Sequence, residues 1–149
     1  LDAAGLNNSE EHKVKVILYP IYLSGGDGLM DLKYYEAMQG GHLGIFPSYY
    51  EPWGYTPLES AALGVPAITT DLAGFGRFLK QSHKGIHILD RMDRTEEEII
   101  NDFTKMMLDY ARTHQQDRVE EKMQAKKLAE KADWNELVKN YYQAHEMAL

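Results

Sequence analysis

Two glutamates lie eight positions apart in a segment rich in aromatic rings, PSYYEPWGYTPLESAALG at residues 47–64. A carboxylate such as Glu51 or Glu59 can accept hydrogen bonds from sugar hydroxyl groups or stabilise positive charge that develops on a sugar ring. The rings of Trp53 and Tyr55 offer flat walls for a sugar or a base. The segment therefore predicts the floor of a binding site, and a tight structural corner is the alternative interpretation.

The letters TPLESAALG carry the start and stop signals of a helix in order. Thr56 is the expected N-cap, Pro57 occupies the first helical position, Glu59 the third, and Gly64 follows the end. The first turn of a helix leaves backbone N–H groups without acceptors and carries the positive end of the helix dipole. The start of this helix is therefore a predicted phosphate site. Gly54 would let a phosphate approach the backbone closely.

Each acid also has a structural interpretation. Glu59 fits a capping box with Thr56, which would make it purely structural. Glu51 lies before the helix, where a solvated loop acid is common. A pair of glycosidase carboxylates is a third interpretation, because the spacing of a loop acid and a helix acid does not fix their geometry. None of the six histidines falls in a metal-ligand spacing, so no metal site is expected.

The elements that must position these residues alternate along the chain. Apolar, β-branched runs predict four strands, separated by short helical patterns and glycine-rich turns, at residues 14–19, 42–48, 66–70 and 85–90. Short strands that are apolar on both faces favour a parallel sheet covered by helices. We therefore expect an α/β, Rossmann-like sheet of about four strands, which binds ligands beyond the carboxyl ends of its strands.

The pattern becomes helical after Asp90. Three helical patterns follow, at residues 95–111, 115–131 and 133–149, and two of them open on capping signatures, Thr95 with Glu98 and Asp133 with Glu136. This change predicts an incomplete Rossmann-like core over residues 1–92 and a helical extension of the same lobe over 93–149.

Composition narrows the possible partners. The formal net charge is −7, so nucleic acid and anionic membranes are not expected partners. The longest apolar run, VILYPIYL, is too short to span a bilayer, and the first residues do not resemble a signal peptide. Without cysteine, a reducing, cytoplasmic location is expected. The sequence opens part way into the strand–helix pattern and without Met, so we expect a piece of a longer chain.

The stretch GIFPSYYEPWGYTPLESAALGVPAITTDLAGFG closely resembles the glycogen synthases of the animal and fungal type, which form glycosyltransferase family 3. The Glu51-x7-Glu59 spacing is shared by the wider class of retaining GT-B glycosyltransferases. Other passages, from VKVILYPIYLSG to DWNELVKNYYQAHEMAL, are also similar, so the resemblance covers nearly the whole chain. It implies part of the C-terminal lobe of a GT-B enzyme, with residues 1–92 as an incomplete nucleotide-sugar-binding core.

The family reaction transfers glucose from UDP-glucose to the non-reducing end of an α-1,4-glucan with retention of configuration and without a metal. The resemblance implies that Tyr34 stacks on the uracil ring and that Glu59 reaches the ribose. It also implies that Glu51 and Trp53 lie by the transferred glucose, and that the diphosphate is held by Gly54, Tyr55 and Thr56. Stacking tolerates any base, so ADP-glucose stays an alternative donor.

The resemblance also predicts what this chain lacks. In the family, the N-terminal lobe supplies phosphate-clamping Arg and Lys side chains, so we expect no transferase activity from these residues alone. Without that lobe, Tyr141, Tyr142 and Met147 lack their usual partner, which makes a homo-oligomer an expected outcome.

Regulated members of the family carry an arginine-rich helix that senses glucose 6-phosphate. The corresponding residues 114–131 contain Arg118 as the single arginine, with Lys122 and Lys127 among several acids. Lysine does not reproduce the two-pronged phosphate grip of arginine, so we expect no activation by glucose 6-phosphate. The alternative function is a non-catalytic module that binds a nucleotide or a sugar phosphate.

Overall fold

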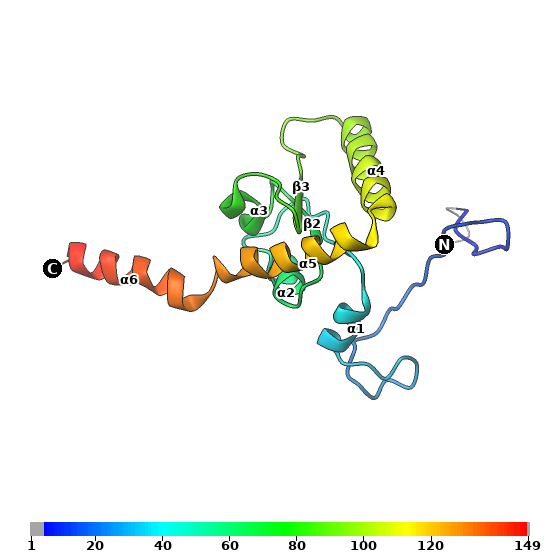
Figure 1. Ribbon diagram of the computed structural model, residues 1–149, viewed down its shortest axis with the longest axis horizontal. Coiled ribbons are helices and arrows are strands. Elements are labelled where there is room, and N and C mark those ends of the chain that lie inside the picture. The colour runs from blue at the N-terminus through cyan, green and yellow to red at the C-terminus, as the bar shows by residue number, and fades with distance from the viewer. Residues whose placement is uncertain (1–4, 149) are drawn as a thin grey trace. The chain divides into compact units, whose positions relative to one another are not determined.

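The computed structural model describes residues 5–148. It forms two compact units, one ending at Tyr34 and one from Tyr35 onward, and each is described by itself. The second unit contains a parallel sheet in the order β1-β2-β3, with β1 at Gly44–Ile45, β2 at Ala67–Thr70 and β3 at Ile86–Leu89 (Figure 1).

Helices alternate with these strands and then continue to the end of the described chain. Their bounds are α1 Tyr34–Gly40, α2 Tyr55–Ala62, α3 Gly74–Leu79, α4 Glu96–Arg112, α5 Gln115–Glu130 and α6 Trp134–Ala148. The predicted α/β class, with a parallel sheet, flanking helices and a helical C-terminal region, is confirmed. The sheet has three strands where about four were predicted.

The central strand β2 explains why the sheet is parallel. All four residues of β2 are buried, and Ala67 pairs with Gly44 on one side and with Ile86 on the other. A strand covered on both faces needs apolar or β-branched residues throughout, as the sequence AITT provides. The core around it comprises Ala61, Ala67, Phe75, Leu79, Ile86, Ile88, Ala125, Leu128 and Ala129.

The strand predicted at residues 14–19 is wrong. This segment is irregular, and Ile17 is 84% exposed. The side chain of Asn8 binds both backbone groups of Val16, since its Oδ1 accepts from the Val16 N–H at 2.7 Å and its Nδ2 donates to the Val16 carbonyl at 2.6 Å. A β-branched run forms a strand only beside a partner strand, and here a side chain takes that partner's hydrogen bonds.

A glycine-rich loop, SGGDG at residues 24–28, follows this segment. Two nearby carboxylates accept hydrogen bonds from backbone N–H groups at its end. The carboxylate of Asp27 accepts the N–H groups of Leu29 and Met30 at 2.9 and 3.1 Å, and Asp31 accepts the N–H of Gly28 at 2.8 Å. These bonds close the loop upon itself, so its backbone N–H groups at residues 28–30 are occupied by the chain's own carboxylates.

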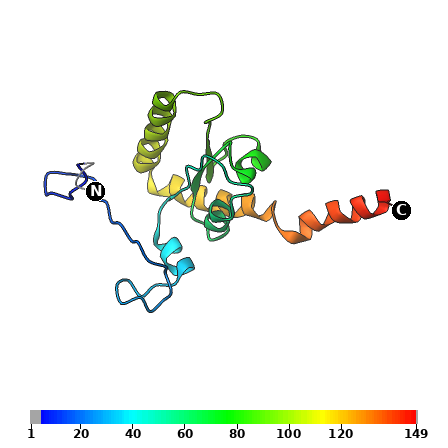
Figure 2. The ribbon, with the colours of Figure 1, turned by 180° about the vertical axis from the view of Figure 1, so that it is seen from behind.

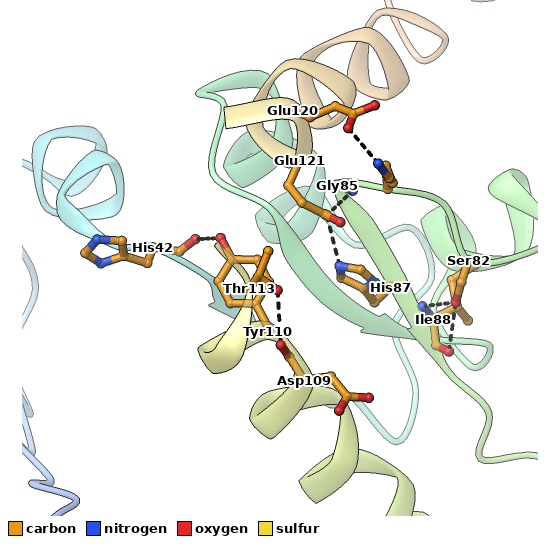
Figure 3. Close-up of polar contacts among 11 residues, drawn as sticks. His42, Ser82, Gly85, His87, Ile88, Asp109, Tyr110, Thr113, Glu120 and Glu121 are labelled. Carbon is orange, nitrogen blue, oxygen red and sulfur yellow. Dashed lines mark hydrogen bonds and ion pairs between the residues drawn. The ribbon is translucent and has the colours of Figure 1, made fainter. Parts of the chain in front are cut away.

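Helix α5 packs closely on α2 (Figure 2), and its Ala125 and Leu128 belong to the same buried cluster as Ile86 of β3. A side chain at Gly85 would collide with the backbone of Ala125, so the two backbones touch directly. Figure 3 shows Glu121 reaching from α5 to the N–H of Gly85, at 2.5 Å, and to Nε2 of His87, at 3.1 Å. The carboxylate therefore joins α5 to the start of β3.

The predicted capping signature is complete at the start of α4 and incomplete at the start of α6. At α4 the predicted capping box is confirmed, because the Thr95 side chain accepts from the Glu98 N–H and the Glu98 carboxylate accepts from the Thr95 N–H. At α6, Asp133 accepts the N–H of Asn135 at 2.7 Å, while Glu136 pairs with Lys139 instead of completing a box. Helix α6 buries none of its described residues. The predicted boundary after residue 92 stays a prediction.

Candidate functional site

The loop that carries Glu51 runs from the end of β1 to the start of α2. Its main chain pairs with the connection between β2 and α3: the Glu51 N–H donates to Leu72, the Gly74 N–H donates to Glu51 at 3.0 Å, and the Phe75 N–H donates to Trp53 at 2.5 Å. These bonds extend the parallel pairing of β1 and β2 beyond the strands. The loop is therefore fixed at the carboxyl edge of the sheet, where open α/β sheets bind ligands.

A glycine permits this close pairing. A Cβ atom at Gly74 would collide with the carbonyl oxygen of Pro52 and the Cα atom of Trp53. Only a residue without a side chain lets the loop lie this near the start of α3. The sequence AGFG, at the start of α3, thus packs directly against the Glu51 loop.

Helix α2 begins earlier than the sequence predicted. Its N-cap is Gly54, with φ 100° and ψ 68°, and no side chain caps the helix. The prediction of Thr56 as the N-cap is therefore wrong, and Pro57 is the third helical residue rather than the first. The physical reason is the left-handed corner at Gly54, which glycine adopts without strain and which starts the helix at Tyr55. Gly64 follows the end of α2, as predicted.

The uncapped start leaves hydrogen-bonding capacity at the first turn of α2. Pro57 has no N–H, so its position there costs no hydrogen bond, while the N–H groups of Tyr55 and Thr56 have no intrahelical acceptor. Both of these residues are exposed. The positive end of the helix dipole lies at the same place, so this turn can bind an anion such as a diphosphate.

Glu51 adjoins the helix start. A Cβ atom added at Gly54 would lie 3.5 Å from Cγ of Glu51, which places the glutamate stem directly beside the corner. The side chain is half-buried, and within residues 5–148 its carboxylate engages in no hydrogen bond or ion pair. A carboxylate with unused oxygen lone pairs, next to a helix start, can act on a positively charged or hydroxyl-bearing group of a ligand.

Glu59 has a different role from the one its spacing suggested. Because Thr56 is not the N-cap, Glu59 does not complete a capping box, and it lies in the second turn of α2. Its carboxylate accepts a hydrogen bond from the hydroxyl of Tyr35 at 3.3 Å. The negative charge of Glu59 raises the pKa of Tyr35 above its ordinary value, which keeps that hydroxyl protonated as a donor. Sequence reasoning missed Tyr35, although it directly follows the selected Tyr34.

The aromatic side chains separate into packed and exposed rings. The indole of Trp53 makes edge contacts with Phe75 and Phe78 of α3, with ring centroids 5.9 and 5.5 Å apart. The ring of Tyr55 is 68% exposed at the start of α2. Trp53 therefore anchors the loop to α3, whereas the ring of Tyr55 faces solvent.

The structure brings six of the seven predicted residues together on one loop and the first two turns of one helix, namely Glu51, Trp53, Gly54, Tyr55, Thr56 and Glu59. Tyr34 is the last residue of the other unit and is described separately: it begins α1 and is 37% exposed.

Residues 5–148 contain neither a metal-binding cluster nor a membrane-spanning helix. No group of three or more His, Asp or Glu side chains is arranged to hold a metal ion. No helix in the same range combines the length and the apolar character that crossing a membrane requires.

Comparison with known proteins matches the chain to one family along its whole length. The family model described as glycogen synthase matches residues 1–149. Liver glycogen [starch] synthase of Homo sapiens is 38% identical over 97% of the chain, and the glycogen [starch] synthase of Neurospora crassa is 35% identical over the same share. Isoform 2 of the Saccharomyces cerevisiae enzyme is 34% identical over 97%. In each case the chain spans about a fifth of the relative, 21% of its length.

Proposed function

Because this chain belongs to the glycogen synthase family, we propose that it forms the donor-binding part of a glucosyltransferase that extends an α-1,4-glucan. The donor is a nucleotide-bound glucose, UDP-glucose or ADP-glucose. The observation that carries the proposal is the uncapped, solvent-facing start of α2 with Glu51 beside it, at the carboxyl edge of a parallel sheet.

The geometry suggests how these residues would act on such a donor. Breaking the bond between sugar and phosphate builds negative charge on the nucleotide diphosphate and positive charge on the sugar. The N–H groups at the start of α2 stabilise the first charge, with the Thr56 hydroxyl as an additional donor. The Glu51 carboxylate stabilises the second charge or orients a sugar hydroxyl. No protein-bound metal takes part in this proposal.

The remaining predicted residues complete the donor site in the proposal. Glu59, oriented by Tyr35, accepts hydrogen bonds from the ribose hydroxyl groups. Tyr34 stacks on the base and Tyr55 flanks the diphosphate. Trp53 acts near the glucose mainly by holding the loop, since its ring packs against Phe75 and Phe78.

The decisive test replaces Glu51 with alanine in the full-length protein that contains this chain. We expect kcat for glucosyl transfer to fall at least ~100-fold, as for the loss of one preorganised electrostatic group. Glu97→Ala is the matched control, because Glu97 is an exposed acid in the first turn of α4. A Glu51→Ala enzyme with near-normal kcat would contradict the proposal.

A second experiment separates the enzyme from a non-catalytic module, the alternative function. Calorimetric titration with UDP and with ADP measures binding, and a transfer assay with glycogen measures turnover. Binding without turnover in the full-length protein would favour the module. Residues 1–149 alone are expected to show no turnover, because in the proposal the phosphate clamp lies in an N-terminal lobe of the same enzyme.

The C-terminal helix is the proposed surface for self-association. Tyr141, Tyr142 and Met147 of α6 are 57%, 64% and 89% exposed. Exposed apolar side chains on one helix favour contact with another protein surface. Sedimentation of residues 1–149 should show a homo-oligomer that Tyr142→Ser weakens, and a monomer at all concentrations would contradict this part of the proposal.

A further inference from the structure

The segments that follow β2 and β3 meet at Asp71. Asp71 lies directly after β2, and its N–H donates to the carbonyl of Leu89 at the end of β3. Its carboxylate accepts two backbone N–H groups from the next segment, that of Arg91 at 2.8 Å and that of Met92 at 3.1 Å. One side chain therefore fixes the backbone that leaves β3 against the end of β2.

The side chain of Arg91 continues this connection to the loop that carries Glu51. Its Nη1 atom donates to the carbonyl of Pro47 at 2.9 Å. The guanidinium carbon lies 3.7 Å from the centre of the Tyr49 ring, which is a cation–π contact. Pro47 and Tyr49 precede Glu51 by four and two residues, so Arg91 holds the first part of the same loop.

The two halves of the loop are held in different ways. Residues 51–53 are paired through the main chain with the start of α3. Residues 47–49 are held by side chains, namely Arg91 and Thr70, whose Oγ1 donates to the carbonyl of Ser48 at 3.0 Å. Removing a side chain can therefore loosen the first half while the second half keeps its main-chain bonds.

The contacts of Arg91 lie outside the hydrophobic core. Its side chain is half-buried at the sheet edge, and the buried cluster around Phe75 and Ile86 does not include it. Loss of the guanidinium removes no core volume, so the expected consequence is local loop motion rather than unfolding.

We propose that Arg91 is a positioning residue for the donor site. Oriented by Asp71, it holds residues 47–49 so that Glu51 and the start of α2 keep the spacing that glucosyl transfer requires. This inference rests on the proposed function, because it assigns Arg91 a part in that reaction without contact with the substrate.

The kinetic test uses Arg91→Ala in the full-length protein. A displacement of about 1 Å in a reacting group can cost ~100-fold in rate, so we expect kcat to fall roughly 10- to 100-fold, with a smaller change in the KM for the nucleotide sugar. Arg91→Lys keeps the charge but not the flat stacking on Tyr49, and should restore part of kcat. Arg94→Ala is the control, since Arg94 lies three residues on and pairs with Asp102 at 2.5 Å.

A second readout is independent of catalysis. Hydrogen exchange of the backbone amides of residues 48–50 should become faster in Arg91→Ala and stay unchanged in Arg94→Ala, while the amides of Glu51 and Trp53 should change less because their segment keeps its main-chain bonds. Unchanged exchange, an Arg91→Ala kcat within about twofold of the parent, or an equal loss in Arg94→Ala, would overturn the inference. If the unmodified full-length protein transfers no glucose, the proposed function fails, and the exchange experiment still decides whether Arg91 holds the loop.

Discussion

Helices α2 and α4 both begin beyond the carboxyl end of a strand in the same parallel sheet, yet their first turns differ. At α4, Thr95 and Glu98 bind each other's backbone N–H groups, which closes the helix start. At α2, Gly54 turns the chain without any side-chain cap. A closed start stabilises its own helix, whereas an open start keeps its N–H groups for a ligand. The comparison indicates which helix start can hold a phosphate.

The variant with the largest expected effect is Gly54→Ala. It tests whether the corner at Gly54 keeps the N–H groups at the start of α2 available for a ligand. Gly54→Ala places a Cβ atom at φ 100° and 3.3 Å from Pro57, so the corner must shift. We expect kcat/KM for glucosyl transfer to fall roughly 100-fold, because the helix start and Glu51 move together. Gly64→Ala is the control: it also has a positive φ, 76°, at the other end of α2. Equal losses in both variants would show that general strain, not the open start, is responsible.

A smaller effect is expected on the free energy of unfolding, where Thr95 and Thr56 should contribute differently. Thr95→Ala removes a true N-cap and should lower the free energy of unfolding by about 1 kcal/mol. Thr56→Ala lies in the first turn of α2 without capping it, and should cost less than ~0.5 kcal/mol while weakening donor binding. Denaturant unfolding of residues 1–149 measures the first quantity, and titration of the full-length protein measures the second. A cost of ~1 kcal/mol for Thr56→Ala would mean that α2 is capped after all.

The stability that the capping box contributes at the start of α4 should depend weakly on pH. Hydrogen bonds from the hydroxyl and the backbone of Thr95 lower the pKa of Glu98 below its ordinary value of 4.5. A lowered pKa in the folded state stabilises the protein above the ordinary value, and this stabilisation is lost as the pH falls through the folded-state pKa. The difference in melting temperature between the parent and Glu98→Gln should therefore shrink as the pH is lowered from 7 to about 3. A difference that stays constant would contradict the capping role.

The smallest expected effect is that of glucose 6-phosphate, to which we expect no response. The guanidinium of Arg118 donates to the carbonyls of Thr113 and Ala111, at 3.0 and 2.8 Å, so it closes the end of α4. An arginine engaged in this way is a poor ligand for an anionic activator. We expect glucose 6-phosphate to change the transfer rate of the full-length protein by less than ~2-fold, well below ordinary allosteric coupling. A clear stimulation that Arg118→Ala abolishes would refute this expectation.

The same comparison shows how far the sequence could predict the fold. The patterns TPLE and TEEE both read as capping signatures, and only the second forms a box. The difference lies in Gly54, whose backbone angles come from the pairing of the Glu51 loop with α3 rather than from the four residues of the pattern. Strands β2 and β3 were predictable because they are buried and apolar. The segment at residues 14–19 was not, because Asn8 satisfies the backbone of Val16.

The candidate site shows a similar limit. Residues from Glu51 to Glu59 were predictable because they are contiguous and chemically distinctive. Arg91 lies 44 positions from Pro47, and a single arginine after a strand carries no local signal for such a contact. Tyr35 was hidden beside Tyr34, because the sequence alone does not show that the hydroxyl of Tyr35 reaches Glu59, 24 positions away.

The contacts of Trp53 have a spectroscopic consequence. The chain contains two tryptophans, and they lie in unlike surroundings: Trp53 packs against two phenylalanine rings beside the Glu51 loop, whereas Trp134 opens α6 and is 68% exposed. A shielded indole emits at shorter wavelength than one in water. Replacing Trp134 with phenylalanine would therefore leave Trp53 as the one tryptophan of the chain, and its emission under selective excitation would report the state of the loop. The residue that anchors this corner of the molecule is also its natural optical probe.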